Sequence, residues 1–359
     1  MSAPDFAVLH LDSGRVWAGG QNQVRLLMRE LAARGVRQLC LCPSGSPLET
    51  RLRAESLPVR GIPWRGPADP RAAAAVWRAL ADHDIVHCHD AHALQIALAA
   101  TALRQRPVVA SRRVHFTTSA RKWNRAARVL AISETVRAAL LRSGVDADRI
   151  RLVPSGIDVD EVRRLPPLEP SLRSRLSLPA GARLVGNIGH LHGYKGQEVI
   201  PRAAARLTGA HWAIIGEGPK RGELEAATAA EGVGDRVHLT GEIRDARRAL
   251  AEFDVFVFTS TQEPLGTSVV DAMASGVPIV GADAAGSAEI LGPVHAETGA
   301  SLVPPGDAES LAAAVARVLA EPDLAAKMVA AQDRRLADFR VERTAELTLE
   351  QYAELLRGR

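Results

Sequence analysis

Short apolar runs alternate with longer amphipathic stretches along most of this chain. Strands that are covered on both faces by helices have this continuous apolar character, whereas the helices between them repeat their apolar residues every three or four positions. The first half of the pattern therefore predicts a doubly wound parallel α/β domain. We expect helices over residues 21–34 and 133–142, and strands over residues 7–11, 36–42, 59–62, 85–88, 108–110, 129–132 and 150–153.

A second series of strands and helices follows a charged, proline-bearing passage at residues 158–181, which we interpret as a linker. Helical periodicity then continues to the end of the chain without another strand, over residues 307–320, 324–339 and 342–356. The pattern predicts two domains, at residues 1–165 and 170–341. Strands of the second are expected at residues 184–188, 212–215, 237–239, 255–258, 278–280 and 301–303.

The length and composition agree with two soluble domains, since 359 residues with 47% hydrophobic content exceed what one core needs. No run of eighteen apolar residues occurs, and residues 1–11 lack a charged leader and a cleavage site. We therefore expect a cytoplasmic protein. Cys40, Cys42 and Cys88 are too few for a disulfide framework, and we expect unreactive thiols.

The charge is nearly balanced, with 45 basic and 41 acidic residues, but residues 91–133 contain basic residues and no acidic one. Such a patch would suit an anionic membrane surface or a phosphorylated acceptor. It would equally suit a solvated face without a partner. No nucleic-acid motif accompanies the charge, so we expect no nucleic-acid partner.

The most informative stretch is residues 263–278, EPLGTSVVDAMASGVP. Glu263 and Asp271 frame a Pro-x-Gly turn that opens a helix ending at Gly276. The first-turn amides of such a helix attract polar or anionic groups, and glycine lets a ligand approach the backbone. An ordinary capped core helix would show the same spacing.

This stretch resembles the Glu-x7-Glu signature of retaining glycosyltransferases of family 4, with Asp271 in place of the second Glu. Residues 187–196 (NIGHLHGYKG), 215–219 (IGEGP) and 152–158 (LVPSGID) resemble three further family motifs, in the family's order. The resemblance implies the α/β fold called GT-B, in which two Rossmann-like doubly wound domains face a central cleft. It also implies that residues 342–359 pack back on the first, acceptor-binding domain, while the second domain binds the nucleotide-sugar donor.

The resemblance gives donor-binding roles to residues of the second domain. Lys195, followed by Gly196, matches the family lysine that meets the diphosphate. His190 stands where the family often has arginine, and a neutral imidazole would offset less phosphate charge. Glu217 lies in the IGEGP turn, which the family places beside the donor.

The helix stretch supplies the remaining donor contacts that the resemblance implies. Glu263 matches the family glutamate that touches donor-sugar hydroxyls and takes part in catalysis. The amides of Leu265, Gly266 and Thr267 would face the sugar and phosphate. Asp271 matches the residue that binds ribose hydroxyls, with a side chain one methylene shorter.

In the first domain, Gly19 and Gly20 occupy the mouth of a helix after the first strand and resemble the family's glycine loop, which approaches donor phosphate and acceptor. The family usually presents a histidine after the fifth strand, near the reacting sugar. Counted without gaps, that position falls on Arg113, whereas His115 is two residues later. Both remain candidates for the catalytic position.

Histidines also gather after the fourth strand, at His87, His89 and His92 with Asp90 between them. Such a cluster can bind metal, but these residues lie on a strand end and the next helix rather than in a closed ligand set. No Asp-x-Asp motif stands where metal-dependent transferases need one. We therefore expect no metal and no cofactor, with the nucleotide sugar as co-substrate.

Together these features predict a retaining, metal-independent glycosyltransferase that moves a sugar from a nucleotide-diphosphate donor to an acceptor hydroxyl. The acceptor would be a glycolipid or saccharide of cell-envelope glycolipid, lipopolysaccharide or polysaccharide synthesis, with the enzyme in the cytoplasm or peripheral on the inner face of the membrane. One alternative is a GT-B sugar-nucleotide epimerase or hydrolase, which would act without an acceptor. A two-lobed binding protein without chemistry is a second alternative.

Overall fold

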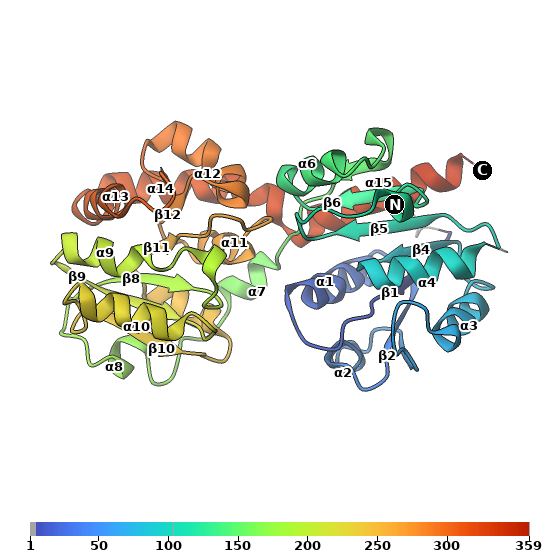
Figure 1. The fold of residues 1–359 in the computed structure, drawn as a ribbon, viewed down its shortest axis with the longest axis horizontal. Helices are drawn as coiled ribbons and strands as arrows, with labels where there is room; N and C mark the ends of the chain where they lie inside the picture. Colours follow the sequence, from blue (N-terminus) through green and yellow to red (C-terminus); the bar gives the residue numbers. More distant parts are fainter. Residues whose placement is uncertain (1–4, 103, 359) are drawn as a thin grey trace. The chain divides into compact units, whose positions relative to one another are not determined.

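A computed structural model describes residues 5–102 and 104–358, and its internal contacts divide the chain into two units. One unit contains Met1–Ile157 and Phe339–Arg359, and the other contains Asp158–Asp338. Each is built on its own parallel sheet (Figure 1). The chain therefore leaves the first unit before residue 165 and returns to it shortly before residue 342.

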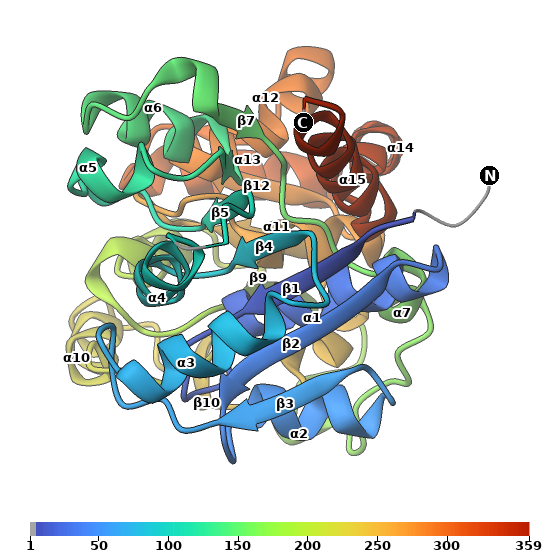
Figure 2. The same ribbon diagram turned by 90° about the vertical axis from the view of Figure 1, so that its right-hand side faces the viewer.

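The first unit contains a seven-stranded parallel sheet in the order β3-β2-β1-β4-β5-β6-β7 (Figure 2). The apolar runs became strands because both faces of the sheet are covered, and each predicted strand overlaps an observed one. The strands are β1 (Ala7–Leu11), β2 (Arg37–Pro43), β3 (Val59–Ile62), β4 (Ile85–Cys88), β5 (Val108–Arg112), β6 (Arg128–Ala131) and β7 (Ile150–Leu152).

One face of this sheet packs against the first and the last helix of the chain. Val8, Ile85 and Val109, on three neighbouring strands, form a core with Leu31 of α1 and Tyr352 of α15. Burial of such side chains stabilises the fold by about 1.5–3 kcal/mol each. The helices of this unit are α1 (Gly19–Ala33), α2 (Pro47–Ala54), α3 (Pro70–Ala79), α4 (Ala91–Thr101), α5 (Ala120–Trp123), α6 (Glu134–Arg142) and α15 (Val341–Arg357).

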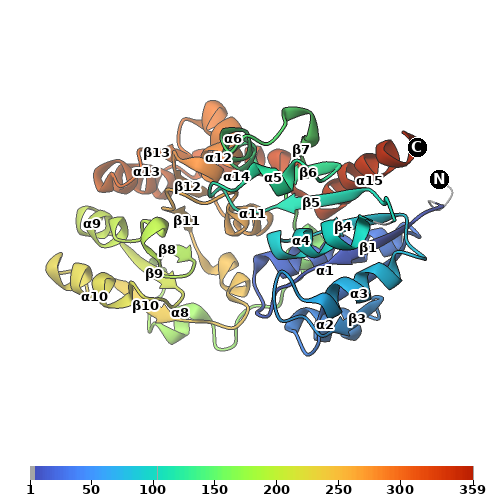
Figure 3. The same ribbon diagram turned by 45° about the vertical axis from the view of Figure 1, so that its right-hand side comes forward.

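The second unit contains a six-stranded parallel sheet in the order β10-β9-β8-β11-β12-β13 (Figure 3). Its strands are β8 (Arg183–Ile188), β9 (Ala210–Ile215), β10 (Val237–Gly241), β11 (Val255–Phe258), β12 (Ile279–Ala282) and β13 (Leu302–Val303). Its helices are α7 (Val159–Arg163), α8 (Leu172–Arg175), α9 (Val199–Arg206), α10 (Arg221–Ala230), α11 (Thr267–Ala274), α12 (Ala285–Thr298), α13 (Ala308–Ala320) and α14 (Pro322–Leu336).

The passage at residues 158–181, predicted as a linker, is part of the second unit. Leu168 and Leu172 are buried there, and the Glu252 carboxylate accepts hydrogen bonds from the backbone N–H groups of Leu172 and Arg173 at 2.8 and 3.0 Å. Proline and charge gave the passage the composition of a linker. The two buried leucines and the two bonds to Glu252 fix it to the domain instead.

Cys40, Cys42 and Cys88 are buried free thiols, as the sequence predicted. Within residues 5–102 and 104–358, the helices are all too short or too polar to cross a bilayer.

Candidate functional site

The candidate donor site lies where the strand order of the second sheet reverses. Successive strands run outward from β8 to β9 and β10 on one side, and from β11 to β12 and β13 on the other. Ligands of open α/β sheets bind beyond the carboxyl ends of the strands at such a point. Here the loop after β8 carries Lys195, and the loop after β11 carries Glu263.

Backbone contacts hold these two loops together. The Tyr194 and Lys195 carbonyls accept hydrogen bonds from the Thr261 N–H at 3.0 Å and the Thr259 hydroxyl at 2.8 Å. Gly196 has a positive φ of 61°, and a Cβ there would lie 2.4 Å from the Thr259 carbonyl oxygen. Only glycine allows this approach without strain. The Lys-Gly pair of the sequence therefore fixes where the lysine points.

The Lys195 ammonium forms an ion pair with the Glu263 carboxylate. The two side chains are only 15% and 21% exposed, so solvent screens the pair less than a surface pair. The lysine nitrogen also lies 5.4 Å from the centroid of the Tyr194 ring. The structure thus brings together the two residues that the sequence singled out from loops 68 residues apart.

Helix α11 begins directly after the Glu263 turn. Its N-terminal cap residue, Gly266, has a φ of 92°, and a Cβ there would meet the Phe258 ring at 3.0 Å. The helix has no capping side chain among the described residues; the Val269 N–H donates to the Gly266 carbonyl at 2.9 Å, which leaves the Thr267 and Ser268 amides for a ligand. The Glu263 carbonyl accepts a hydrogen bond from the Gly286 N–H at 3.0 Å, which fixes the turn to α12.

Asp271 lies one turn inside α11, beside charged residues of other elements. Burial raises its pKa to about 7; the Arg247 guanidinium opposes this shift, and the carboxylates of Asp245 and Glu161 add to it. Arg247 is itself bound to Asp245 at 2.9 Å and to Glu161 at 3.2 Å. Near neutral pH, Asp271 can therefore donate as well as accept a hydrogen bond.

His190 and Glu217 lie on the exposed part of this edge. Glu217 pairs with Arg221 at 2.9 Å, and its carbonyl accepts from the Leu191 N–H at 3.0 Å. A Cβ on Gly216 would lie 2.0 Å from the Gly189 carbonyl, so the two glycines let the turn after β9 pack on the loop after β8. His190 is exposed on that second loop. Neither side chain forms a hydrogen bond or ion pair with Lys195 or Glu263 within the described structure.

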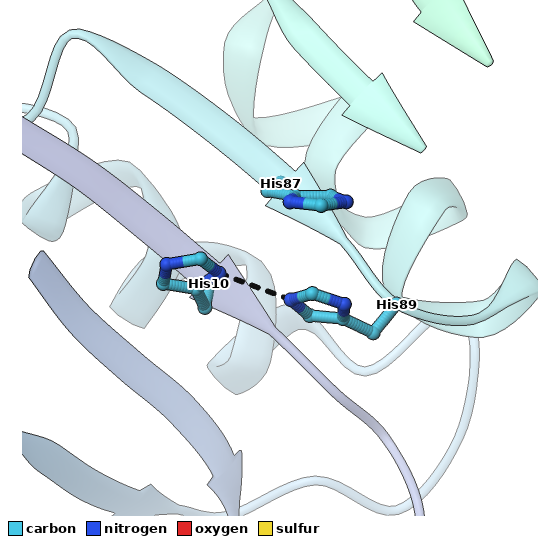
Figure 4. Close-up of side chains that lie close together, drawn as sticks. All are labelled: His10, His87 and His89. Carbon is cyan, nitrogen blue, oxygen red and sulfur yellow. Dashed lines mark hydrogen bonds between the residues drawn. The ribbon is translucent and has the colours of Figure 1, made fainter. Parts of the chain in front are cut away.

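A polar layer interrupts the core of the first sheet, also where its strand order reverses. Side chains alternate between the two faces of a strand, and Val8 and His10 of β1 pair with Ile85 and His87 of β4. These four side chains therefore lie on one face of the sheet, and His89 continues the alternation on that face. His10 Nδ1 lies 3.0 Å from His89 Nε2 (Figure 4). All three histidines are buried, and burial lowers the pKa of each, that of His10 to about 3.

This layer fixes Arg113, which follows β5. The Arg113 guanidinium donates to the His89 carbonyl at 3.0 Å and to His89 Nδ1 at 3.3 Å. Because arginine can only donate, His89 Nε2 carries the ring proton and donates it to His10. Burial lowers the pKa of Arg113 to about 10, opposed by the charges of Asp12 and Asp90. Arg113 therefore remains a cation at neutral pH.

Comparison with known proteins matches each of the two units to a glycosyltransferase family. Residues 17–161 match Glycosyltransferase Family 4, and residues 182–321 match Glycosyl transferases group 1. The chain belongs to the family 4 glycosyltransferases. It is 33% identical over 156 residues to the lipopolysaccharide core biosynthesis glycosyltransferase LpsE of Rhizobium meliloti, covering 44% of this chain and 45% of LpsE. It is 30% identical over 250 residues to the 2-deoxystreptamine glucosyltransferase of Streptomyces kanamyceticus, covering 67% of this chain and 64% of that enzyme.

Solved structures support the GT-B fold of this glycosyltransferase. Anabaena HepE in complex with UDP and glucose has a TM-score of 0.83 and 22% identity, covering 97% of this chain and 99% of HepE. A glycosyltransferase from Rickettsia africae has a TM-score of 0.86 and 18% identity, covering 99% of each chain. The sequence matches, by contrast, span less than two thirds of the length of LpsE and of the 2-deoxystreptamine glucosyltransferase.

The histidine layer of the glycosyltransferase meets one condition for metal binding, since ring nitrogens of His10, His87 and His89 all lie within 4.8 Å of one another. Most of the ring nitrogens are already engaged, however, and only His10 Nε2 is buried without a partner among the described residues. His87 Nδ1 lies 2.6 Å from the Tyr352 hydroxyl, and His87 Nε2 lies 2.8 Å from that of Ser111. His89 is bonded on both sides, on one of them to a cation. These contacts favour a structural hydrogen-bond layer.

The structure separates the two candidates for the catalytic position of the first domain. Arg113 joins the histidine layer, and its Cδ lies 4.0 Å from where a Cβ on Gly20 would stand. Gly19 and Gly20 are the first residues of α1, with space around Gly19. His115 instead packs its ring 4.8 Å from that of Phe116, and its Nδ1 is buried without a partner in the described chain.

Sequence reasoning missed two contributors to these sites. His10 lies on the first strand, far from the other histidines in the chain, and only the pairing of His10 with His87 across β1 and β4 brings it to them. Arg247 follows an Asp245 with a positive φ of 51°, and no pattern in the sequence connects it to Asp271. For His10, the available signal in the sequence was the alternation of Val8, His10 and Asp12.

Proposed function

We propose that this glycosyltransferase moves a sugar from a nucleotide-diphosphate donor to an acceptor hydroxyl in cell-envelope glycolipid, lipopolysaccharide or polysaccharide synthesis. The observation that carries the proposal is the Lys195 and Glu263 pair beside the uncapped start of α11. A diphosphate needs the cation and the amides, and a sugar needs hydrogen-bond acceptors such as the carboxylate. The UDP and glucose of HepE and the lipopolysaccharide role of LpsE agree with this choice.

In the proposed reaction, the bond between the anomeric carbon of the sugar and the diphosphate oxygen breaks. The acceptor hydroxyl oxygen bonds to that carbon, and its proton passes to an oxygen of the departing diphosphate. Lys195 and the first-turn N–H groups of α11 would stabilise the charge that develops on the leaving group. Glu263 would bind sugar hydroxyls and Asp271 the ribose.

We propose attack on the same face that the diphosphate leaves, with retention of configuration. Glu263 is held by Lys195, which suits a binding carboxylate better than a free nucleophile. Protein groups supply the positive charge at the diphosphate, so we propose that transfer needs no metal. In the first domain we propose Arg113 rather than His115 as the residue nearest the reacting groups, because the histidine layer orients it.

Only the correct donor is expected to stabilise the protein in a thermal-shift screen of UDP-, GDP- and ADP-sugars. A donor at 100 times its Kd raises the free energy of unfolding by about 2.7 kcal/mol. The stabilising donor is then incubated with envelope extracts, and the anomeric configuration of the product is read by NMR, with and without EDTA. No stabilisation by any donor, or an inverted product, would contradict the proposal or its retaining step.

The same assay without an acceptor tests the alternative chemistry. An epimerase or hydrolase would convert the stabilising sugar nucleotide on its own. A transferase would leave most of it intact until an acceptor is added.

We also propose that the first domain binds anionic membrane surfaces through the segment after β5. Val114 and Phe116 are 39% and 63% exposed there, and Arg121 and Arg125 of the α5 region are exposed cations. Neither arginine is paired with a carboxylate among the described residues. An aromatic side chain with neighbouring cations suits the headgroup region, where each arginine contributes about 1 kcal/mol.

Vesicle sedimentation tests this surface. The wild type is expected to bind phosphatidylglycerol vesicles and to be released by salt, and Phe116→Ser with Arg121→Ser should lose most of the binding. Phosphatidylcholine vesicles and the Arg78→Ser variant, changed at an exposed arginine of α3, serve as controls. Equal binding by the double variant would remove the membrane from the proposal.

A further inference from the structure

The first unit contains a cavity that the proposed donor and catalytic residues do not use. Its volume is about 230 Å³, and it lies beyond the carboxyl ends of β2 and β3. The residues that line it come from the loop after β1, the end of β2 and the segment from β3 to α3. They include Arg15, Ser44, Trp64, Arg65 and Arg71.

The lining carries an excess of positive charge. Arg71 is paired with Asp69 at 3.0 Å, but Arg15 and Arg65 have no carboxylate partner in the described chain. Arg15 donates instead to the Trp64 carbonyl, which holds its side chain at the cavity. Two uncompensated guanidinium groups at one cavity favour a ligand with carboxylate or phosphate oxygens.

Trp64 provides the second, independent observation. The residue lines the cavity, and it is buried, at 3% exposure. Its indole N–H has no hydrogen-bond acceptor among the residues described. A buried N–H without a partner costs about 1–3 kcal/mol, so a small shift of the indole that exposed it to a ligand oxygen would lower the free energy. The Ser44 hydroxyl, which is exposed at the same cavity, offers a further polar contact.

The volume, the charge and the exposed hydroxyl together select the ligand class. A cavity of about 230 Å³ holds one monosaccharide, and ligand pockets for larger molecules start at roughly 300 Å³. Arginine binds acidic groups, and the exposed Ser44 hydroxyl can bond to a sugar hydroxyl. We propose that this cavity is an acceptor subsite for one acidic monosaccharide unit, bearing a carboxylate or a phosphate. The inference rests on the proposed transferase function, because it assigns the acceptor to the first domain.

Calorimetric titration of the full chain without donor tests the subsite. Glucose 6-phosphate and glucuronate are the probes, with glucose and inorganic phosphate for comparison. We expect an acidic sugar to bind at least about tenfold more tightly than glucose, and Arg15→Ala or Arg65→Ala each to weaken it about tenfold. The probe that binds better identifies the acidic group. Both arginines are exposed, so these variants should fold, and Arg78→Ala is the matched control.

Three results would overturn the subsite. The first is no binding of either acidic sugar at millimolar concentration, and the second is binding that Arg15→Ala and Arg65→Ala leave unchanged. The third is inorganic phosphate binding as tightly as the sugars, which would mean an anion site without sugar recognition. Donor stabilisation is measured on the same preparation, so a failed subsite with intact donor binding leaves the transferase function standing.

Discussion

Replacing Lys195 by methionine is expected to lower kcat/KM for sugar transfer by about 10²–10³-fold, the effect typical of removing one preorganised group that stabilises a leaving group. Methionine retains much of the volume and removes only the cation. Donor-dependent thermal stabilisation should fall in parallel, because the diphosphate then meets only the amides of α11.

A loss of activity could also come from damage to the fold, and the ion pair allows the two causes to be separated. Lys195→Met leaves the poorly exposed Glu263 carboxylate without its partner, which should lower the free energy of unfolding by about 1–3 kcal/mol. Adding Glu263→Gln removes that charge. The double variant should therefore recover thermal stability while transfer stays low.

Lys327→Met is the matched control, since Lys327 is an exposed lysine of the same unit that donates to the Glu297 carbonyl at 2.9 Å. It should change neither stability nor transfer. If Lys195→Met bound the donor and turned it over like the wild type, Lys195 would not be a diphosphate ligand. If the double variant recovered activity together with stability, the pair would be structural.

The fold was largely predictable from the sequence because its strands are covered on both faces. The predicted strands at residues 7–11, 59–62, 85–88 and 255–258 have the observed bounds. Where bounds differ, the reason is local. Residues 324–339 were predicted as one helix, but Pro322 starts α14 earlier, and residues 337–339 form a 3-10 turn.

The site was predictable from the sequence only where the residues that form it lie within a single loop. The loops at Gly196 and Gly266 could be recognised from the sequence, because glycine is expected at such positions. Both residues have a positive φ and a close neighbour where a Cβ would stand. The partnership of Lys195 with Glu263 came from family resemblance, and its physical cause is the adjacency of β8 and β11. His10 and the cavity at Arg15 depend on strand register and on loops from several strands. Neither leaves a pattern in one segment.

Acid is expected to unfold the first unit through its buried histidines. The pKa of His10, His87 and His89 in the folded state lies below the ordinary value of 6.5, mainly because burial disfavours the charged ring. Below that value the unfolded chain binds more protons, so stability is fully present above about pH 6.5 and is lost as the pH falls. Each histidine contributes a slope of about 1.4 kcal/mol per pH unit.

The groups around the layer modify this slope. Tyr352 and Ser111 stay uncharged, and Arg113 stays charged, in this range. Asp12 opposes the loss, because burial and the charge of Asp90 raise its pKa, so the folded state gains a proton there before the unfolded state does. Three histidines lower the free energy of unfolding as the pH falls, and one aspartate raises it. The net loss is about 3 kcal/mol per pH unit, compared with a total stability of about 5–15 kcal/mol.

Hydrogen exchange of the β1 and β4 amides between pH 7 and 4.5 measures this loss in the first unit alone, once rates are corrected for the intrinsic pH dependence. His10→Gln removes one titrating ring, so its stability should fall less steeply, by about 1.4 kcal/mol per pH unit. His192→Gln, at an exposed histidine, should follow the wild type. Parallel profiles for wild type and His10→Gln would mean that His10 is protonated in the folded state. The histidine layer would then be a charged cluster, and the conclusion that it holds the Arg113 guanidinium in a fixed position would be wrong.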